Sequence, residues 1–359
     1  MRGELDPQGQ MFSYFSPESR VPADHPLRSI KAHTDRVLKE LSGELDALYA
    51  ETGRPSIPPE RLLKGQLLIA LYSVRSDRLF CQMLDYNILF RWFLDMSLEE
   101  PSLDQSNFTR LRERLVNEDL AQRFFDAIVK LARSEGLLSS EHLTVDGTLI
   151  EAWAGQKSFR PKDGPPPPSD GRGGVNFRGR KRTNDTHASS TDPEAKSARK
   201  GPGKEAKLCF GGHALMENRN GLCVDIRVSS ALETESAAAA ELLKRQGRKR
   251  VKPASLGADK GYHNKAFVAW LRCKGIRPHI AQIEGRNTPG LDGRTTRHES
   301  YAVSQRKRKR VEEIFGWMKS WGGLRRTRFR GIERVQLHAH FVGAAYNLLR
   351  LSRLRPAPA

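Results

Sequence analysis

Cysteine is scarce in this sequence of 359 residues, and long apolar runs and a signal-like N-terminus are lacking. Its four cysteines form no Cys-x-x-Cys pair and have no suitably spaced histidines nearby, which argues against a zinc site and a disulfide framework. No apolar run approaches the length of a transmembrane helix, and residues 1–10 are polar and acidic. We therefore expect no membrane-spanning segment and a cytoplasmic location.

Acidic residues are also fewer than basic residues. Lys and Arg together number 61 against 42 Asp and Glu, which gives a formal net charge of +19, and basic clusters recur along the second half. A membrane surface fits this charge less well than nucleic acid, because no long basic amphipathic segment carries bulky apolar anchors. Neutralising phosphates releases counterions and drives binding, so the expected partner is a nucleic acid.

The pattern divides the chain into a tail (residues 1–26), a helical domain (27–135) and an α/β domain (136–354). Helical periodicity fills the first domain, where Pro58 and Pro59 open a strongly apolar segment. In the second, an apolar run at 142–150 predicts a buried strand that ends on Asp146, and Asn-Gly at 220–221 predicts a hairpin. Helices and strands then alternate, which predicts a mixed sheet flanked by helices.

An insertion at residues 155–206 interrupts the α/β domain. It contains four consecutive prolines (165–168), many glycines and a basic cluster at 178–182. This composition predicts a flexible loop without regular structure. Its cations suit DNA contact, and a solvated linker is the alternative.

Two arginine-rich segments are candidate DNA contacts. A helix is expected from Ser102, and its Arg110 and Arg112 would meet phosphates, although many solvated helices show the same pattern. The segment 322–330 combines two glycines with four arginines and is expected to line the DNA path; those proposed for contact are Arg325, Arg326 and Arg328.

The segment 306–319 places a carboxylate among cations on an amphipathic helix. Val311, Ile314, Phe315 and Met318 have the spacing of one buried stripe. At about 100° per residue, Arg308, Glu312 and Lys319 share a line on the border of that stripe, whereas Glu313 points away from it. Glu312 is therefore the candidate functional carboxylate, and a salt-bridged surface helix is the alternative.

Two aspartates complete a candidate metal site. Asp146 and Asp259 lie at expected strand ends beside Gly147 and Gly261, so they can converge with Glu312 at one edge of the sheet. Carboxylate oxygens suit Mg²⁺, which needs few of them and is completed by water and phosphate. Two such ions about 4 Å apart support in-line displacement at phosphorus, the chemistry of nucleases and strand transfer.

These motifs resemble those of the cut-and-paste DDE transposases of bacterial insertion sequences, over nearly the whole chain. Residues 145–148 resemble the first-strand motif of that family and 257–262 resemble its fourth-strand motif. Arg308, Glu312 and Lys319 match most of the C-terminal signature. The signature usually begins with a tyrosine three residues before the arginine, where this chain has Gln305; this departure concerns a DNA contact and not the metal ligands.

The resemblance implies a ribonuclease-H-like catalytic core in which Asp146, Asp259 and Glu312 bind two Mg²⁺ ions, with Mn²⁺ able to substitute. Arg308 and Lys319 would hold phosphates of the transposon end. The implied function is binding of terminal inverted repeats in double-stranded DNA, cleavage, and strand transfer into target DNA, by a homodimer or larger assembly associated with the nucleoid. A non-catalytic DNA-binding protein derived from a transposase and a nuclease without strand transfer are the alternatives.

Overall fold

The computed structural model describes residues 14–47, 56–117, 119–162, 182–283, 285 and 288–354. Most of the basic cluster at 178–182, to which the sequence assigned DNA contact, lies outside these residues. Among the helices in these ranges, none has the length and apolar content needed to cross a membrane.

The N-terminal part is all helical, as predicted. Proline at the first turn of α2 and α3, and the side chains of Ser76 and Asn87 at the starts of α4 and α5, fix where these helices begin. Their apolar faces meet around Phe80, whose ring centroid lies 6.0 Å from that of Phe90 and 5.2 Å from that of Phe108. The helices are α1 (Pro17–Arg20), α2 (Pro26–Asp46), α3 (Pro59–Leu71), α4 (Asp77–Met83), α5 (Ile88–Phe93), α6 (Gln105–Asn117) and α7 (Leu120–Ser134).

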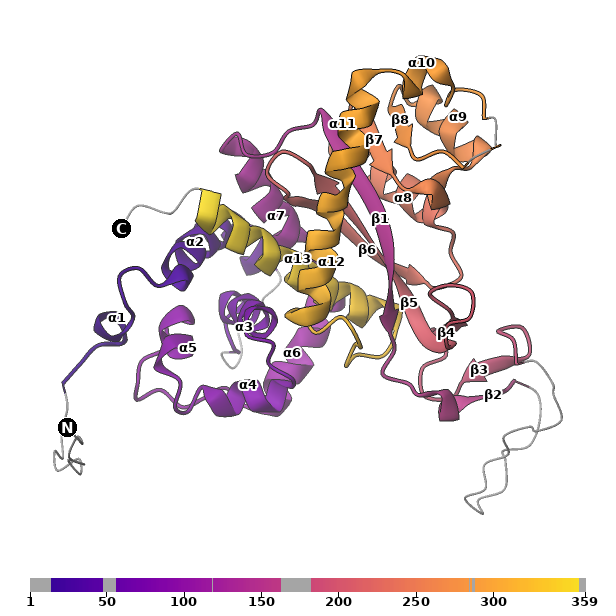
Figure 1. Cartoon of the computed structure of the whole chain (residues 1–359). Coiled ribbons are helices and arrows are strands. Elements are labelled where there is room, and N and C mark those ends of the chain that lie inside the picture. The colour runs from indigo at the N-terminus through magenta and orange to yellow at the C-terminus, as the bar shows by residue number, and fades with distance from the viewer. Residues whose placement is uncertain are drawn as a thin grey trace, which may run out of the picture.

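A mixed sheet forms the centre of the second part (Figure 1). Five of its six strands run in the order β6-β5-β1-β7-β8; β5 is antiparallel to β6 and β1, and β1, β7 and β8 are parallel. This is the ribonuclease-H-like arrangement that the family resemblance implied, and the α/β class that the sequence pattern predicted is confirmed. The strands are β1 (His142–Glu151), β5 (Lys207–Glu217), β6 (Cys223–Ser230), β7 (Ser255–Ala258) and β8 (Arg277–Ile280).

The predicted hairpin joins β5 to β6. Gly221 has a φ of +68°, which an L side chain rarely adopts. The two carboxylate oxygens of Glu217 accept hydrogen bonds from the backbone amides of Arg219 and Asn220, each at 2.7 Å. The turn is therefore closed by its own side chains.

The insertion is partly ordered, contrary to the expectation for residues 155–206. Beyond a 3₁₀ turn (η1, Gln156–Ser158), β2 (Phe159–Pro161) pairs with β3 (His187–Ser189), and β4 (Lys196–Ala198) joins the main sheet beside β5. The Asn184 carboxamide accepts from the Ser197 amide at 2.8 Å and donates to the Ser197 carbonyl at 2.9 Å. Polar side chains thus satisfy the hydrogen-bonding groups of the backbone in the insertion. Order of this kind produces no apolar periodicity in the sequence, so the sequence pattern did not predict it.

Helices cover the sheet and connect it to the N-terminal part. The C-terminal helix α13 packs against β6 and also against α2, α3 and α7, and the ring of its Phe341 lies 6.1 Å from that of Phe124. One helix is therefore shared by the two predicted domains. The helices of this part are α8 (Glu235–Arg248), α9 (Lys265–Cys273), α10 (Gly293–Thr296), α11 (Glu299–Lys307), α12 (Val311–Ser320) and α13 (Ile332–Leu354), with 3₁₀ turns η2 (Lys260–Tyr262) and η3 (Arg308–Arg310).

Candidate active site

Asp146 lies in the middle of β1 and not at its end, so the predicted strand end is wrong. The strand continues to Glu151 because β5 pairs with it along that whole stretch. The parallel neighbour β7 is shorter: its last residue in register with β1 is Gly257, opposite Thr144. Asp146 and Asp259 each follow this pair by two residues. The two aspartates therefore meet where β7 ends, across a spacing typical of adjacent strands, about 4.8 Å.

The helix α12 brings the third carboxylate to the same place. It runs alongside β1 (Figure 1), and its predicted stripe is buried, with Ile314 at 0% and Met318 at 1% exposure. Lys319 donates to the Thr148 hydroxyl at 2.5 Å, and Thr148 shares a strand face with Asp146. Glu312, on the line of Lys319 along the helix, is close enough to Asp146 to influence its pKa.

Asp146 sits in an electrostatic field dominated by carboxylates. The pKa of its carboxyl is raised to about 6, chiefly by burial and also by the negative charges of Asp259 and Glu312. The Gly147 amide, which donates to Asp146 Oδ1 at 2.8 Å, and the nearby Arg308 guanidinium lower it. The site therefore carries an excess of negative charge that a cation would relieve.

Glu313 faces the other way, as helix phase predicted. Its Oε2 lies 2.8 Å from Arg350 Nη1 on α13, and its Oε1 lies 3.8 Å from Arg310 Nε. Glu313 is thus part of a salt-bridge network on the far side of α12.

A fourth carboxylate, Glu235, was missed by the sequence reasoning. It is the first residue of α8, whose cap is the Thr234 side chain. A Cβ added to Gly261 would lie 2.7 Å from Glu235 Oε2 and 3.0 Å from Asp259 Oδ1, so a larger residue there would displace the Glu235 carboxylate. Burial, and then Asp259 and Asp146, raise the pKa of Glu235. The one signal for Glu235 in the sequence was its position at a capped helix start directly after a predicted strand.

The donor atoms fit a hard divalent cation such as Mg²⁺. The four side chains offer only oxygen ligands, and their mutual repulsion is what an ion offsets. As they stand, no three His, Cys, Asp or Glu side chains among the described residues are close enough together to enclose one ion. Mg²⁺ does not require this, because one or two carboxylates with water and phosphate suffice. Asp146, Asp259 and Glu312 are the residues that would hold it.

Gln305, where the family signature has tyrosine, is a structural anchor. Its Nε2 donates to the His279 carbonyl at 2.6 Å, and the Tyr301 hydroxyl donates to the Ile280 carbonyl at 2.9 Å. Both residues thus fasten α11 to β8. Arg308 differs, because its buried Nε has no hydrogen-bond partner among the described residues. Its guanidinium charge nevertheless acts on Asp146, because it lowers the pKa of that carboxyl.

Cations gather where β1 ends. Burial lowers the pKa of Lys319, and the neighbouring charges of Lys200 and Arg325 lower it further. Lys200, in the insertion, was not anticipated. Arg326 donates to the Trp153 carbonyl at 3.0 Å, and its guanidinium lies 5.6 Å from the centre of the Trp153 ring. This group gives the predicted DNA path a positive border next to the carboxylates.

The remaining predicted contacts divide into exposed and buried arginines. Arg110 is exposed and donates to Asn107 Oδ1 at 2.8 Å. Arg112, by contrast, forms a buried ion pair with Asp77, which also binds Arg328 at 3.1 Å. The reason is helix phase, since Arg112 follows the fully buried Phe108 by four residues. We therefore no longer count Arg112 and Arg328 among the phosphate contacts.

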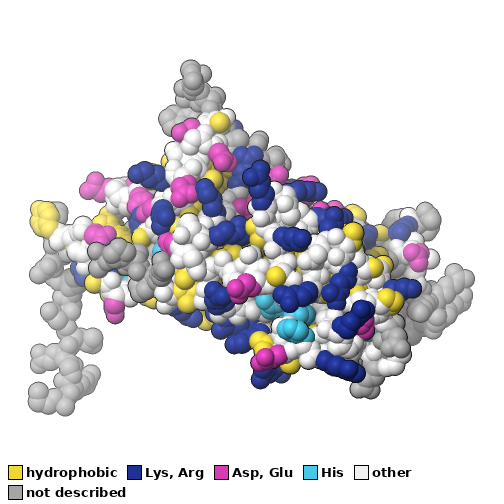
Figure 2. Space-filling model, turned by 90° about the horizontal axis from the view of Figure 1, so that it is seen from above, with side chains coloured by type: hydrophobic (Ala, Val, Ile, Leu, Met, Phe, Trp, Pro, Cys, Tyr) yellow, Lys and Arg dark blue, Asp and Glu magenta, His cyan; other side chains and the backbone are white. Residues whose placement is uncertain are grey.

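Basic side chains also spread over the wider surface. Figure 2, which looks down on the molecule from above the view of Figure 1, shows many Lys and Arg side chains around a few histidines, with Asp and Glu sparser. The α10 end contains a hollow of about 440 Å³ with Arg272, Arg277 and Arg294 in its lining. Positive charge is therefore not confined to the carboxylate site.

Comparisons with known proteins agree with this geometry. Residues 140–348 match a family model described as a transposase DDE domain, and residues 15–114 match one described as a transposase domain (DUF772). No curated protein sequence matches the chain.

Solved structures show only distant similarity. A piggyBac transposase synaptic complex with hairpin DNA is 12% identical, with a TM-score of 0.42 over 92% of this chain and 76% of that one. A Mos1 transposase paired-end complex is 13% identical, with a TM-score of 0.21 over 82% and 79%. Structural similarity this low carries no further inference.

Proposed function

Because the chain belongs to the transposases that carry a DDE domain, we propose that it binds the terminal inverted repeats of its own element, cleaves the DNA there with the help of a divalent metal, and transfers the strand. The observation that carries this proposal is the meeting of Asp146 and Asp259 where β7 ends, with Glu312 beside them on α12. No ion pair within the described residues compensates the Asp146 carboxylate, and this excess of negative charge suits a metal-dependent reaction.

Asp146, Asp259 and Glu312 hold the metal, and Glu235 lies next to them. Bound Mg²⁺ supplies a lowered pKa for the attacking oxygen and stabilisation of the leaving one. Arg308 and Lys319 bind the phosphate from the flanks: the Arg308 charge lies close enough to Asp146 to lower its pKa, and the ammonium of Lys319 is held in place by Thr148. These side chains orient the phosphodiester for in-line attack.

The reaction has two steps of the same kind. In the first, water attacks phosphorus, the bond to the 3′ oxygen breaks, and a 3′-hydroxyl and a 5′-phosphate are left. In the second, that 3′-hydroxyl attacks a phosphodiester of target DNA, so one bond forms as another breaks and no external energy source is needed. Joining two ends of one element requires both to be held together, and we propose a dimer or larger assembly on DNA.

The test uses purified protein and duplex DNA from the ends that flank its gene, with Mg²⁺ or with EDTA. Wild-type protein is expected to give cleaved and joined products only with metal. Asp146→Asn, Asp259→Asn and Glu312→Gln should each lose about 4 kcal/mol of transition-state stabilisation, roughly a thousandfold in rate. Glu313→Gln is the matched control on the adjacent residue and should retain activity.

Other outcomes lead to other functions. Cleavage without joined products would indicate a nuclease that lacks strand transfer. Binding of the ends without any metal-dependent cleavage would indicate a non-catalytic DNA-binding protein. Equal losses in Glu313→Gln and Glu312→Gln would contradict the assignment of the third carboxylate.

A further inference from the structure

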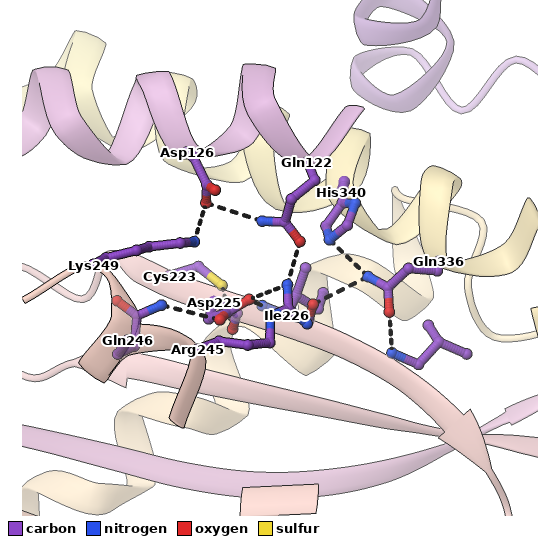
Figure 3. A network of polar contacts seen from close by, with 11 residues as sticks. Gln122, Asp126, Cys223, Asp225, Ile226, Arg245, Gln246, Lys249, Gln336 and His340 are labelled. Carbon is purple, nitrogen blue, oxygen red and sulfur yellow. Dashed lines mark hydrogen bonds and ion pairs between the residues drawn. The ribbon is translucent and has the colours of Figure 1, made fainter. Parts of the chain in front are cut away.

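A basic run at the C-terminal end of α8 is divided between two sides. Arg245 Nη2 lies 3.0 Å from Asp225 Oδ1, and Lys249 Nζ lies 2.6 Å from Asp126 Oδ1 on α7 (Figure 3). Asp225 is fully buried, and its Oδ2 accepts from Gln246 at 3.0 Å. Two cations of the run therefore pair with carboxylates of the protein itself, Arg245 with a buried one and Lys249 with a partly exposed one.

The other cations line a surface hollow of about 580 Å³ between the ends of α8 and α9. We call it the cationic groove; it contains Lys244, Arg248, Arg250, Lys252 and Lys274, with Trp270 in its wall and no Asp or Glu in its lining. Helix phase explains the division. Lys244 and Arg248 are four residues apart and lie on one side of α8, whereas the residues that follow them, Arg245 and Lys249, lie on another side, where they form the ion pairs. All five side chains of the groove are exposed.

The charge of the groove is largely uncompensated. Lys244 and Arg248 share Glu241, at 3.5 and 4.0 Å. Within the described ranges, no carboxylate lies within 4.0 Å of Arg250, Lys252 or Lys274, and no hydrogen bond fixes their side chains. Five cations beside one carboxylate are the footprint of a polyanion.

The helix α8 connects this groove to the carboxylate site. Glu235 is its first residue and Arg248 its last, so 14 residues separate the two ends by about 20 Å. That distance corresponds to about six base pairs of duplex DNA at 3.4 Å per step. Between them, the exposed positions Ala237 and Gly247 are small, and a Cβ on Gly247 would meet nothing within 4 Å. The outward face of α8 is therefore unobstructed at these two positions.

We propose that the cationic groove binds the phosphate backbone of the duplex whose reacting phosphodiester lies at Asp146 and Asp259, about six base pairs away along α8. This inference rests on the proposed function for the position of the reacting phosphate. The contact would be made by charge and not by base edges, so it is independent of sequence.

Fluorescence anisotropy with a duplex of about 30 base pairs, spanning the junction of element and flank, tests the groove in EDTA, where no cleavage occurs. Lys252→Glu/Lys274→Glu reverses two groove charges. Lys39→Glu/Lys130→Glu makes the same change on exposed positions of α2 and α7. The groove variant should lose at least tenfold in affinity and lower the salt dependence by about two phosphate contacts. Glu241→Gln should bind more tightly than wild type.

Position is tested by crosslinking. In a Cys273→Ser background, which removes the exposed cysteine among four, Lys252→Cys carries a photo-crosslinker. Crosslinks are expected about six base pairs from the reacting phosphate. Crosslinks elsewhere, or none, would overturn the proposed path.

The two proposals fail in different ways. If wild-type protein does not cleave with Mg²⁺ but the groove variant still loses affinity, the proposed function fails and the groove stands as a DNA contact. If wild-type protein cleaves and both double variants bind equally, the groove is not a DNA contact. If the groove bound an acidic peptide and the groove variant bound DNA as tightly as wild type, the proposed DNA contact would also be overturned.

Discussion

Two aspartates on neighbouring parts of one sheet have opposite surroundings. Asp225 on β6 is fully buried and compensated: it accepts from the Ile226 amide at 2.8 Å and from Gln246 at 3.0 Å, and it pairs with Arg245. Asp146 on β1 has only the Gly147 amide, and no ion pair joins it to any described residue. Burial raises the pKa of both carboxyls. The fold thus compensates the buried Asp225 charge and leaves the partly exposed Asp146 charge available.

The difference separates a structural carboxylate from a functional one. A buried charge without a partner costs stability, so a protein retains one only where something else binds it. Around Asp146 the nearest charges include two further carboxylates, which increase the excess of negative charge there. Around Asp225 the charges of Arg245 and Lys249 oppose it. Each prediction below changes one side of this comparison.

The largest effect is expected from Asp225→Ala. It leaves Arg245 without its buried partner, and the free energy of unfolding should fall by about 3 kcal/mol. Urea denaturation measures this, with Asp146→Ala as the matched control. Similar losses in the two variants would show that Asp146 is as structural as Asp225.

Mg²⁺ should stabilise the protein through the unpaired site alone. At about a hundredfold excess over its dissociation constant, a ligand that binds only the folded state adds about 2.7 kcal/mol. Thermal unfolding should therefore shift upward by a few degrees with Mg²⁺. Asp146→Asn should abolish the shift, whereas Glu313→Gln should preserve it; an undiminished shift in Asp146→Asn would place the metal elsewhere.

The pH dependence of stability in EDTA should reveal the cost at Asp146. Its pKa is about 6 in the folded protein against an ordinary 3.8, so the folded state binds more protons than the unfolded state between these values. The free energy of unfolding therefore decreases as pH rises through this window. Because the side chain is partly exposed, the discounted cost at pH 7 is about 1–2 kcal/mol. Asp146→Asn should remove this decrease, as urea titrations at a series of pH values would show; an unchanged profile would contradict it.

The smallest effect compares the two sides of α12. Glu313→Gln loses ion pairs with Arg350 and Arg310, which are partly exposed, and should cost at most about 1 kcal/mol. Glu312→Gln breaks no ion pair within the described residues and should leave the denaturation midpoint unchanged or raise it. A larger loss in Glu312→Gln would mean that this carboxylate supports the fold.

Local sequence pattern determined the elements and their facing sides. The period of an α-helix separates Glu312 from Glu313 and buries the stripe of Ile314 and Met318, because the turn angle is fixed by the backbone alone. The Asn-Gly signal likewise identified the hairpin before β6, since Gly221 needs a positive φ. These features depend on residues within a few positions of one another.

Only the tertiary structure decided which charges have partners. Asp146 is uncovered because the neighbouring strand β7, more than 100 residues later in the chain, is short. β1 itself continues past Asp146 to Glu151. Glu235 joins Asp146 because α8 begins there, and Asp77 on α4 supplies the partner of Arg112, which helix phase turns inward. The division of the basic run at the end of α8 depends on α7 and β6, through Asp126 and Asp225. Sequence spacing sets where a side chain points along its own element, whereas the charge it meets comes from another element.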